Sequence, residues 1–382
     1  MDLSIAEKHF KNAVKSKFNG RVVTIGRTAN LTEPLESQNR GKCMYRSQCD
    51  RGCSYGAYFS TLSSTLPAAT NTGNLTTKAD TIVASLDFDN KNKKIIGINA
   101  IDTKSKKLYK IKSRVVFLCA STVASIQILF NSKSHSMPNG LGNNYDILGR
   151  FLMDHTFGTG ATGILPFYNE YIEYGRRPTG MYIPRFRNLK NDQNKHEFVR
   201  GYNFQSWGQG RVPPQDINGF GEKLKKNLRI PGPWRLPLHA FCEILPRKSN
   251  RILVDDNKVD QYGIPQVKFE FEWSENEINM LNDATEQAEL MLKAAGCTSI
   301  EKRSVQSAPG TGIHEMGGAR MGNDPTKSIV NRYNQAHFAD NLFITDGSAM
   351  TSASSVNPSI TYMAMTARAA NYASDQIKRN KI

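Results

Sequence analysis

The sequence has few cysteines and no long hydrophobic run, and both absences narrow the class of protein. Six cysteines in 382 residues are too few to staple a chain of this size, so a disulfide-based secreted scaffold is excluded. No stretch approaches the roughly 18 consecutive apolar residues of a membrane-spanning helix. Residues 1–18 lack the apolar core of a signal peptide. The sequence as given therefore predicts a soluble, cytoplasmic chain, with a periplasmic location left open for a signal in a preceding segment.

The basic residues lack the arrangement of a nucleic-acid-binding surface. The chain carries 50 Lys and Arg against 34 Asp and Glu, a formal net charge of +16. Its basic clusters are short and interrupted, and no repeated aromatic residues are interleaved with them to stack on bases. We therefore expect no nucleic-acid partner and interpret the clusters as solvated strand edges and helix ends.

The spacing of apolar residues in residues 81–132 predicts strands followed by a helix. Residues 81–89, 94–102 and 107–113 are short β-prone runs separated by Asn, Lys and Asp, which is typical of an antiparallel meander. Residues 114–121 form a largely apolar run that passes directly into a helical pattern at 122–132. A buried strand that leads straight into a helix indicates a parallel, doubly wound sheet.

The remaining patterns complete an α/β prediction with an attached α+β lobe. Residues 1–18 have the spacing of an amphipathic helix. Residues 151–272 are rich in aromatics, Pro and Gly, which favours a β-rich lobe with long loops, where substrate pockets are common. A capping box at 274–277 opens a helix that ends at Gly296. The C-terminal helix begins at Asn357-Pro358, since proline suits a first helical position.

Residues 341–370 place an acidic residue at a strand end, before a loop of small residues and a helix N-terminus. Exposed N–H groups and the positive end of the helix dipole meet there and favour an anionic or electron-rich ligand. The alternative is that Asn357 merely caps the helix.

His314 lies on a glycine-flanked loop, residues 310–322. The usual pKa of histidine suits proton abstraction near neutrality, although a lone histidine is more often structural. The presence of Asn357 favours a catalytic role for His314 over a structural one. His314 could take the hydroxyl proton of an alcohol while Asn357 hydrogen-bonds the same oxygen.

These two segments resemble the glucose-methanol-choline (GMC) flavin oxidoreductases, particularly the branch with gluconate-dehydrogenase-like and pyranose-oxidase-like C-termini. GTGIHEMGGARMG at 310–322 is similar to the catalytic-histidine segment, and residues 345–370 are similar to the flavin-contacting strand, Asn-Pro turn and final helix. The resemblance implies an FAD-dependent dehydrogenase or oxidase that acts on CH–OH groups of a sugar, sugar acid or polyol. His314 would abstract the proton, Asn357 would assist, and the hydride would go to flavin N5.

The resemblance also implies cofactor contacts and a domain plan. The implied FAD-binding residues are Val83, Asp346, Gly347, Asn357, Pro358 and Ser359. Residues 1–150 would be the remaining part of the FAD-binding domain, 151–310 the substrate-binding lobe, and 311–382 the return to the FAD-binding domain. LGRFLMDH, ending at His155, resembles the entry to the substrate lobe, and we interpret this histidine as structural.

The front of the sequence departs from the family. Members begin with a βαβ unit whose G-x-G-x-x-G turn cradles the FAD pyrophosphate, and the N-terminal glycines here do not form that turn. We therefore predict a truncated or split member. Two readings stay open: an enzyme acting on a small alcohol or sugar, and a non-catalytic fragment or one half of a split flavoprotein with a complementing N-terminal chain. The electron acceptor is not predicted.

Three cysteines lie close together at Cys43, Cys49 and Cys53. Such a cluster could hold a metal or an iron–sulfur centre, but a fourth ligand is not evident and the segment also resembles a plain loop of the family. We favour the loop and predict no metal. Cys119, Cys242 and Cys297 stand singly in apolar surroundings and are predicted to be buried thiols.

Overall fold

The structure is a computed structural model that describes residues 2–26, 29–46, 49–171, 180–190, 195–206, 219–308 and 310–382. It divides into two compact units. Unit 1 comprises Met1–Thr77, Phe157–Cys242 and Glu275–Gln306, and unit 2 comprises Lys78–Thr156, Glu243–Ser274 and Ser307–Ile382. This division differs from the expected boundaries, because residues 1–77 join the middle lobe and residues 243–274 join the segments on either side of it.

Unit 1 contains a six-stranded sheet in the order β1-β7-β8-β9-β6-β12, and every neighbouring pair is antiparallel. The strands are β1 (Thr24–Ile25), β6 (Thr159–Leu165), β7 (Met181–Ile183), β8 (Tyr202–Ser206), β9 (Trp234–Cys242) and β12 (Thr298–Arg303). A β-rich lobe was expected in this part of the sequence, and the sheet confirms it.

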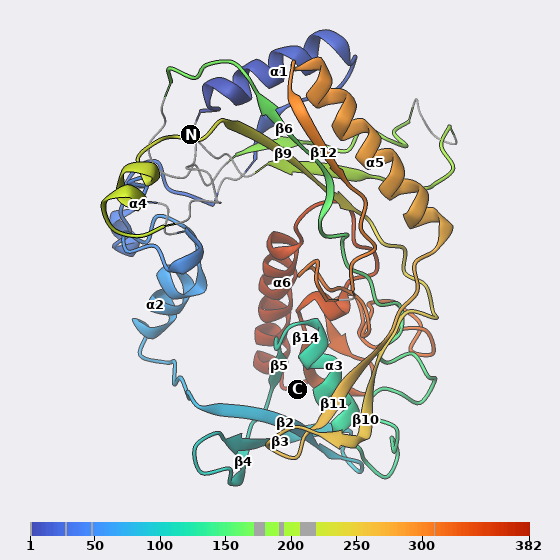
Figure 1. Ribbon diagram of the computed structural model, residues 1–382. Coiled ribbons are helices and arrows are strands. Elements are labelled where there is room, and N and C mark those ends of the chain that lie inside the picture. Colours follow the sequence, from blue (N-terminus) through green and yellow to red (C-terminus); the bar gives the residue numbers. More distant parts are fainter. Residues whose placement is uncertain are drawn as a thin grey trace. The chain divides into compact units, whose positions relative to one another are not determined.

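Two long helices pack on that sheet, α1 (Ile5–Lys17) and α5 (Glu275–Ala294), and Figure 1 shows them beside β6, β9 and β12. Phe10 and Val14 of α1 are buried with Trp234 of β9 in one apolar cluster. A capping box fixes the start of α1, since Ser4 and Glu7 each accept the other's backbone N–H. Shorter helices are η1 (Glu36–Gln38), η2 (Cys49–Arg51), η3 (Thr61–Ser63), α2 (Thr65–Thr70) and α4 (Gly221–Leu228).

Unit 2 contains the expected meander and a parallel strand pair. The meander is β2 (Thr81–Asp89), β3 (Lys94–Asp102) and β4 (Leu108–Lys112). A second sheet has the order β13-β14-β5, with β14 parallel to β5, and a hairpin joins β10 to β11. Their bounds are β5 (Val116–Leu118), β10 (Arg251–Val259), β11 (Pro265–Glu270), β13 (Gln335–Ala336) and β14 (Ala339–Ile344).

The helices of unit 2 follow strands, as the sequence predicted. Helix α3 (Thr122–Asn131) comes just after β5, and its Ile126 is fully buried in the core with Leu118 and Leu342. The turn η4 (Gly347–Ala349) follows β14, and α6 (Ser359–Lys378) follows Pro358. Only Ala369 and Ala373 of α6 are buried. Among the described residues, no helix combines the length and the apolar composition that crossing a membrane requires.

Candidate functional site

His155, His314 and Asn357 form a hydrogen-bonded row within unit 2. Nδ1 of His155 lies 2.9 Å from Nδ1 of His314, and the two rings meet edge-on at 80°. Nε2 of His314 lies 3.0 Å from Nδ2 of Asn357. The structure therefore brings together the two predicted residues of the pair and adds His155, which the sequence had suggested was structural.

Asp154 fixes the loop that presents His314. Its carboxylate accepts the backbone N–H of His155 at 2.7 Å and those of Gly312 and His314 at 3.0 Å each. A Cβ atom at Gly312 would lie 2.2 Å from the carbonyl oxygen of His155 and 2.5 Å from the Asp154 carboxylate, so only glycine fits this approach. The carboxylate thus joins two segments that are far apart in the sequence.

Two residues beside the row have a backbone conformation that L-residues rarely adopt. Ile313, directly before His314, has φ +56°, and Ser354 has φ +60°. A β-branched residue with positive φ is an outlier, and such strain costs about 1–3 kcal/mol per residue and tends to occur at functional sites. The backbone N–H groups on either side of Ile313, those of Gly312 and His314, donate to Asp154. These two hydrogen bonds stabilise the strained conformation of Ile313.

The charge states in the row follow from burial. His155 is 1% exposed, and burial lowers its pKa to about 4 against the opposing effect of the Ser354 carbonyl. Burial also lowers the pKa of His314 to about 4. For Asp154, burial and then the nearby Glu315 raise the pKa to about 6 despite the three N–H bonds. Both imidazoles are therefore neutral near pH 7, and a neutral His314 is able to accept a proton.

Asp346 and Gly347, two of the implied cofactor contacts, serve the packing of the strand end. The buried Asp346 carboxylate accepts hydrogen bonds from Ser125 and from the backbone and hydroxyl of Ser348, and burial raises its pKa. A Cβ at Gly347 would lie 2.5 Å from both the Glu315 carbonyl oxygen and the Thr122 hydroxyl. This close contact ties the His314 loop to the end of β14.

The other implied cofactor residues differ in exposure. Pro358 is buried, whereas Asn357 and Ser359 are exposed at the start of α6. The N-cap residue of that helix is Pro358, and its side chain makes no capping hydrogen bond. Val83 lies in β2, pairs with Ala100 and packs against the core of unit 2, so its place beside an adenine ring stays a prediction.

A glycine pattern of the dinucleotide-binding type does occur, at Gly158, Gly160 and Gly163, and it was missed in the sequence. The structure places it at and within β6 of the antiparallel sheet. A Cβ at Gly160 would lie 1.9 Å from the Leu238 carbonyl oxygen. These glycines permit close strand packing, and they do not form the strand-to-helix turn that cradles a pyrophosphate.

All six cysteines lie within the described residues, and none of them forms a disulfide bond there. Cys43, Cys49 and Cys53 are partly buried, and the described residues contain no group of three or more His, Cys, Asp or Glu suited to a metal ion. Cys242 and Cys297 are buried as predicted. The prediction for Cys119 was wrong: it is exposed, because it follows β5 at the strand end, and its Sγ lies 3.1 Å from the Thr345 hydroxyl.

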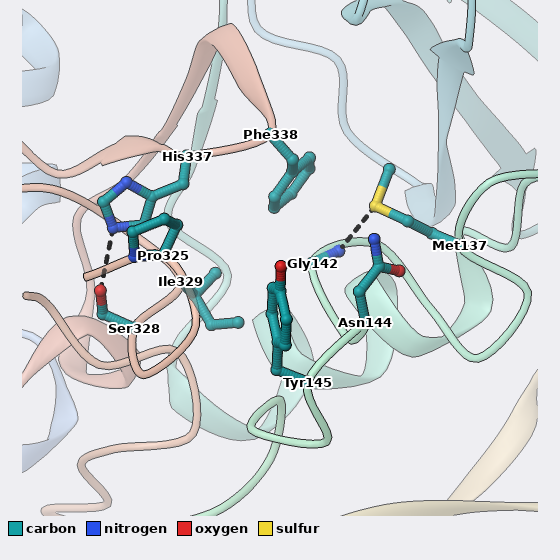
Figure 2. A pocket seen from close by; sticks show the side chains of 9 residues that line it. All are labelled: Met137, Gly142, Asn144, Tyr145, Pro325, Ser328, Ile329, His337 and Phe338. Atoms are coloured by element: carbon teal, nitrogen blue, oxygen red, sulfur yellow. Dashed lines mark hydrogen bonds between the residues drawn. The ribbon is translucent and has the colours of Figure 1, made fainter.

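A separate hollow in unit 2 contains none of the predicted site residues (Figure 2). Its volume is about 100 Å³, well below the 300 Å³ or more typical of ligand pockets. Nε2 of His337 lies 2.9 Å from the Ser328 hydroxyl at its edge. The lining residues are Met137, Gly142, Asn144, Tyr145, Pro325, Ser328, Ile329, His337 and Phe338.

Sequence reasoning missed Asp154 and the contact of His155 with His314. The available signal was the adjacent Asp-His pair directly after the apolar residues 151–153. Buried polar side chains such as Asp154 and His155 need hydrogen-bond partners. Here the His314 loop supplies partners to both of them.

Comparison with curated proteins gives relatives that are alcohol or sugar dehydrogenases by name. The chain is 29% identical over 291 residues to 2-methyl-1,2-propanediol dehydrogenase of Mycolicibacterium austroafricanum, covering 74% of this chain and 52% of that protein. It is 23% identical over 344 residues to the fructose dehydrogenase large subunit of Gluconobacter japonicus, covering 89% and 61%. The chain thus spans between half and two thirds of the length of these relatives.

Solved structures share the fold. Pyridoxine 4-oxidase from Mesorbium loti superposes with a TM-score of 0.56 at 14% identity, over 97% of this chain and 69% of that one. A formate oxidase from Aspergillus oryzae RIB40, studied for its FAD modification, superposes with a TM-score of 0.60 at 12% identity, over 83% and 63%.

Family comparison agrees with these relatives. Residues 10–157 and 246–366 match the two parts of the GMC oxidoreductase family, which together span more than half of the sequence. The second match contains His314 and Asn357, and the first contains His155. The chain belongs to the GMC oxidoreductase family.

Proposed function

We propose that this chain belongs to an FAD-dependent oxidoreductase acting on a CH–OH group of a sugar, sugar acid or polyol. It would provide His314, which accepts the substrate proton, and Asn357, which assists it. The observation that supports the proposal most directly is the 3.0 Å contact between His314 Nε2 and Asn357 Nδ2, in a chain of the GMC oxidoreductase family. The curated relatives named above act, by their names, on a diol and on fructose.

His314 and Asn357 divide the work on the substrate oxygen. Neutral His314 takes the hydroxyl proton at Nε2, while the Asn357 amide donates a hydrogen bond to the oxygen as negative charge develops on it. The electron pair of the broken O–H bond then forms the carbonyl as the carbinol C–H bond breaks. FAD, when bound, supplies the acceptor for that hydrogen and its two electrons.

The start of α6 fits an electron-rich aromatic cofactor. Its N-cap residue is Pro358, whose side chain makes no capping hydrogen bond, and the positive end of the helix dipole lies there. Val356 is 49% exposed and Ile360 is 76% exposed, which offers apolar surface to a flat ring. We infer that Asn357 and Ser359 face the cofactor, whereas Asp346 and Gly347 shape the turn behind it.

A second reading is a non-catalytic fragment, or one half of a flavoprotein completed by a second chain. It is favoured by the exposed apolar residues of α6, Ile360 and Met363, which is 47% exposed. It is also favoured because the described residues show no glycine turn between a strand and a helix of the dinucleotide-binding type. A complementing chain would then supply the βαβ unit for the ADP part of FAD.

The visible spectrum of the purified chain with added FAD distinguishes the two readings. Retention of flavin absorbance after gel filtration supports cofactor binding by this chain, and complete loss favours the split reading. With FAD retained, or restored by a complementing chain, a panel of polyols and sugars should bleach the flavin without oxygen. His314→Ala should nearly abolish bleaching, and His337→Ala, at the unrelated hollow, should not. Undiminished bleaching by His314→Ala would overturn the proposed function.

A further inference from the structure

The proton positions along the row can be derived from its end at Ser354. Nε2 of His155 lies 2.7 Å from the Ser354 carbonyl oxygen, which can only accept a hydrogen bond, so Nε2 carries a proton. His155 is 1% exposed, and burial disfavours a second proton on the ring. A neutral imidazole has one N–H, so Nδ1 of His155 bears a lone pair.

The same reasoning fixes His314. Its Nδ1 lies 2.9 Å from Nδ1 of His155, and a hydrogen bond between two nitrogens needs one proton between them. Because His155 offers a lone pair there, His314 is the donor. Its single proton is then on Nδ1, and Nε2 bears a lone pair that faces the Asn357 amide N–H at 3.0 Å.

We propose that His155 is a positioning residue that holds His314 in the tautomer protonated at Nδ1, so that Nε2 is the basic atom beside Asn357. In the other tautomer, two donors would face each other at Asn357, and Nε2 could not accept a proton. The catalytic meaning of this control rests on the proposed function, but the tautomer itself is a property of the chain.

The arrangement also tolerates the proton that His314 would gain. A proton added at Nε2 leaves the Nδ1–H bond to neutral His155 in place, so that only the contact with the Asn357 amide has to change, because two donors then face each other there. Asp154 holds both histidine backbones through their N–H groups. Of the other acidic residues, Glu315 acts on Asp154, and buried Glu243 pairs with His155 in a β-bridge. The Ser354 carbonyl is presented by the left-handed backbone at that residue.

Nitrogen NMR of the imidazoles tests the tautomer without any turnover. The chain has seven histidines, so selective ¹⁵N-histidine labelling gives a sparse long-range ¹H–¹⁵N spectrum, and His314→Ala assigns the His314 signals. We expect His314 protonated at Nδ1 and His155 at Nε2. His155→Leu removes the acceptor and should shift His314 toward the Nε2–H tautomer, whereas His155→Gln keeps an acceptor oxygen and should retain Nδ1–H. The control His337→Leu should leave the His314 signals unchanged.

Two results would overturn the proposal: His314 protonated at Nε2 in the unaltered chain, or an unchanged Nδ1–H tautomer in folded His155→Leu. If circular dichroism shows that His155→Leu does not fold, the unaltered chain and His155→Gln still decide, because both must show Nδ1–H.

Flavin reduction separates this proposal from the proposed function. In protein with bound FAD, His155→Leu should slow anaerobic flavin reduction on the order of 10²-fold, and His155→Gln should recover most of the rate. If His314→Ala reduces flavin normally, the proposed function fails while the tautomer result stands. If His314→Ala is inactive but His155→Leu changes neither tautomer nor rate, only the role of His155 fails.

Discussion

Asp154 and Asp346 are both buried carboxylates of unit 2, 4% and 8% exposed, and burial raises the pKa of each. Their partners differ. Asp154 accepts three backbone N–H groups, two of them from the His314 loop. Asp346 accepts from the Ser125 hydroxyl and from the backbone and hydroxyl of the neighbouring Ser348. The Asp154 carboxylate therefore assembles two segments that are distant in the sequence, whereas the Asp346 carboxylate shapes a turn and anchors it to α3.

The largest expected effect comes from truncating the two carboxylates. Asp154→Ala leaves three backbone donors without their acceptor and should lower the free energy of unfolding by about 3–5 kcal/mol. Asp346→Ala should cost about 1–3 kcal/mol, because two of its three donors are hydroxyls that can rotate to other partners. Urea unfolding of both variants measures this, and an equal or reversed order would remove the distinction drawn between the two residues.

The glycine beside each carboxylate gives the next test. Gly312→Ala would place its Cβ 2.2 Å from the His155 carbonyl oxygen, and relief of that overlap should cost about 2–3 kcal/mol and displace His314 from Asn357. Gly310→Ala is the control, because its nearest neighbour would be the flexible Glu315 carboxylate at 3.5 Å. Its positive φ of +81° should limit the loss to about 1–2 kcal/mol. Equal losses of stability and equal changes of the His314 NMR signals in Gly310→Ala and Gly312→Ala would contradict the importance of the close approach at Gly312.

Local patterns explain why part of the molecule could be predicted. The meander, the start of α6 directly after Pro358 and the pairing of His314 with Asn357 follow from turn residues, a helix start signal and family-like segments. The contact between Asp154 and Gly312 joins residues 158 apart, and no local periodicity encodes it. The chain passes from unit 1 to unit 2 between Thr77 and Lys78, and no change in composition marks that point. Asp346 was chosen for its place at a strand end, and Asp154 was overlooked because its partners are backbone groups.

The pH dependence of stability separates Asp154 from the two histidines. Its folded pKa of about 6 lies above the usual 3.8, so the folded state binds the proton more tightly, and this contribution to stability is lost as the pH rises from about 4 to 6. His155 and His314 have folded pKa values of about 4, below the usual 6.5, so they act oppositely and lose stability as the pH falls through the same window.

Asp154→Asn removes the first of these two opposing effects. The stability of the variant relative to the unaltered chain should therefore rise, by about 1–3 kcal/mol, as the pH increases from 4 to 6.5. Urea unfolding at several pH values measures the difference, and a flat difference would show that Asp154 does not titrate in this range.

The smallest expected effects come from two hydroxyls one turn apart on α3. Thr122 donates to the Glu315 carbonyl of the His314 loop at 2.5 Å, whereas Ser125 donates to Asp346. Thr122→Val and Ser125→Ala should each cost about 1 kcal/mol, the usual worth of one hydrogen bond. Stability alone cannot tell them apart, but the His314 imidazole signals should move in Thr122→Val and stay in place in Ser125→Ala. Signals that move equally in both variants would mean that the strand end and the His314 loop respond as one cooperative unit, and that Asp346 supports the row as directly as Asp154 does.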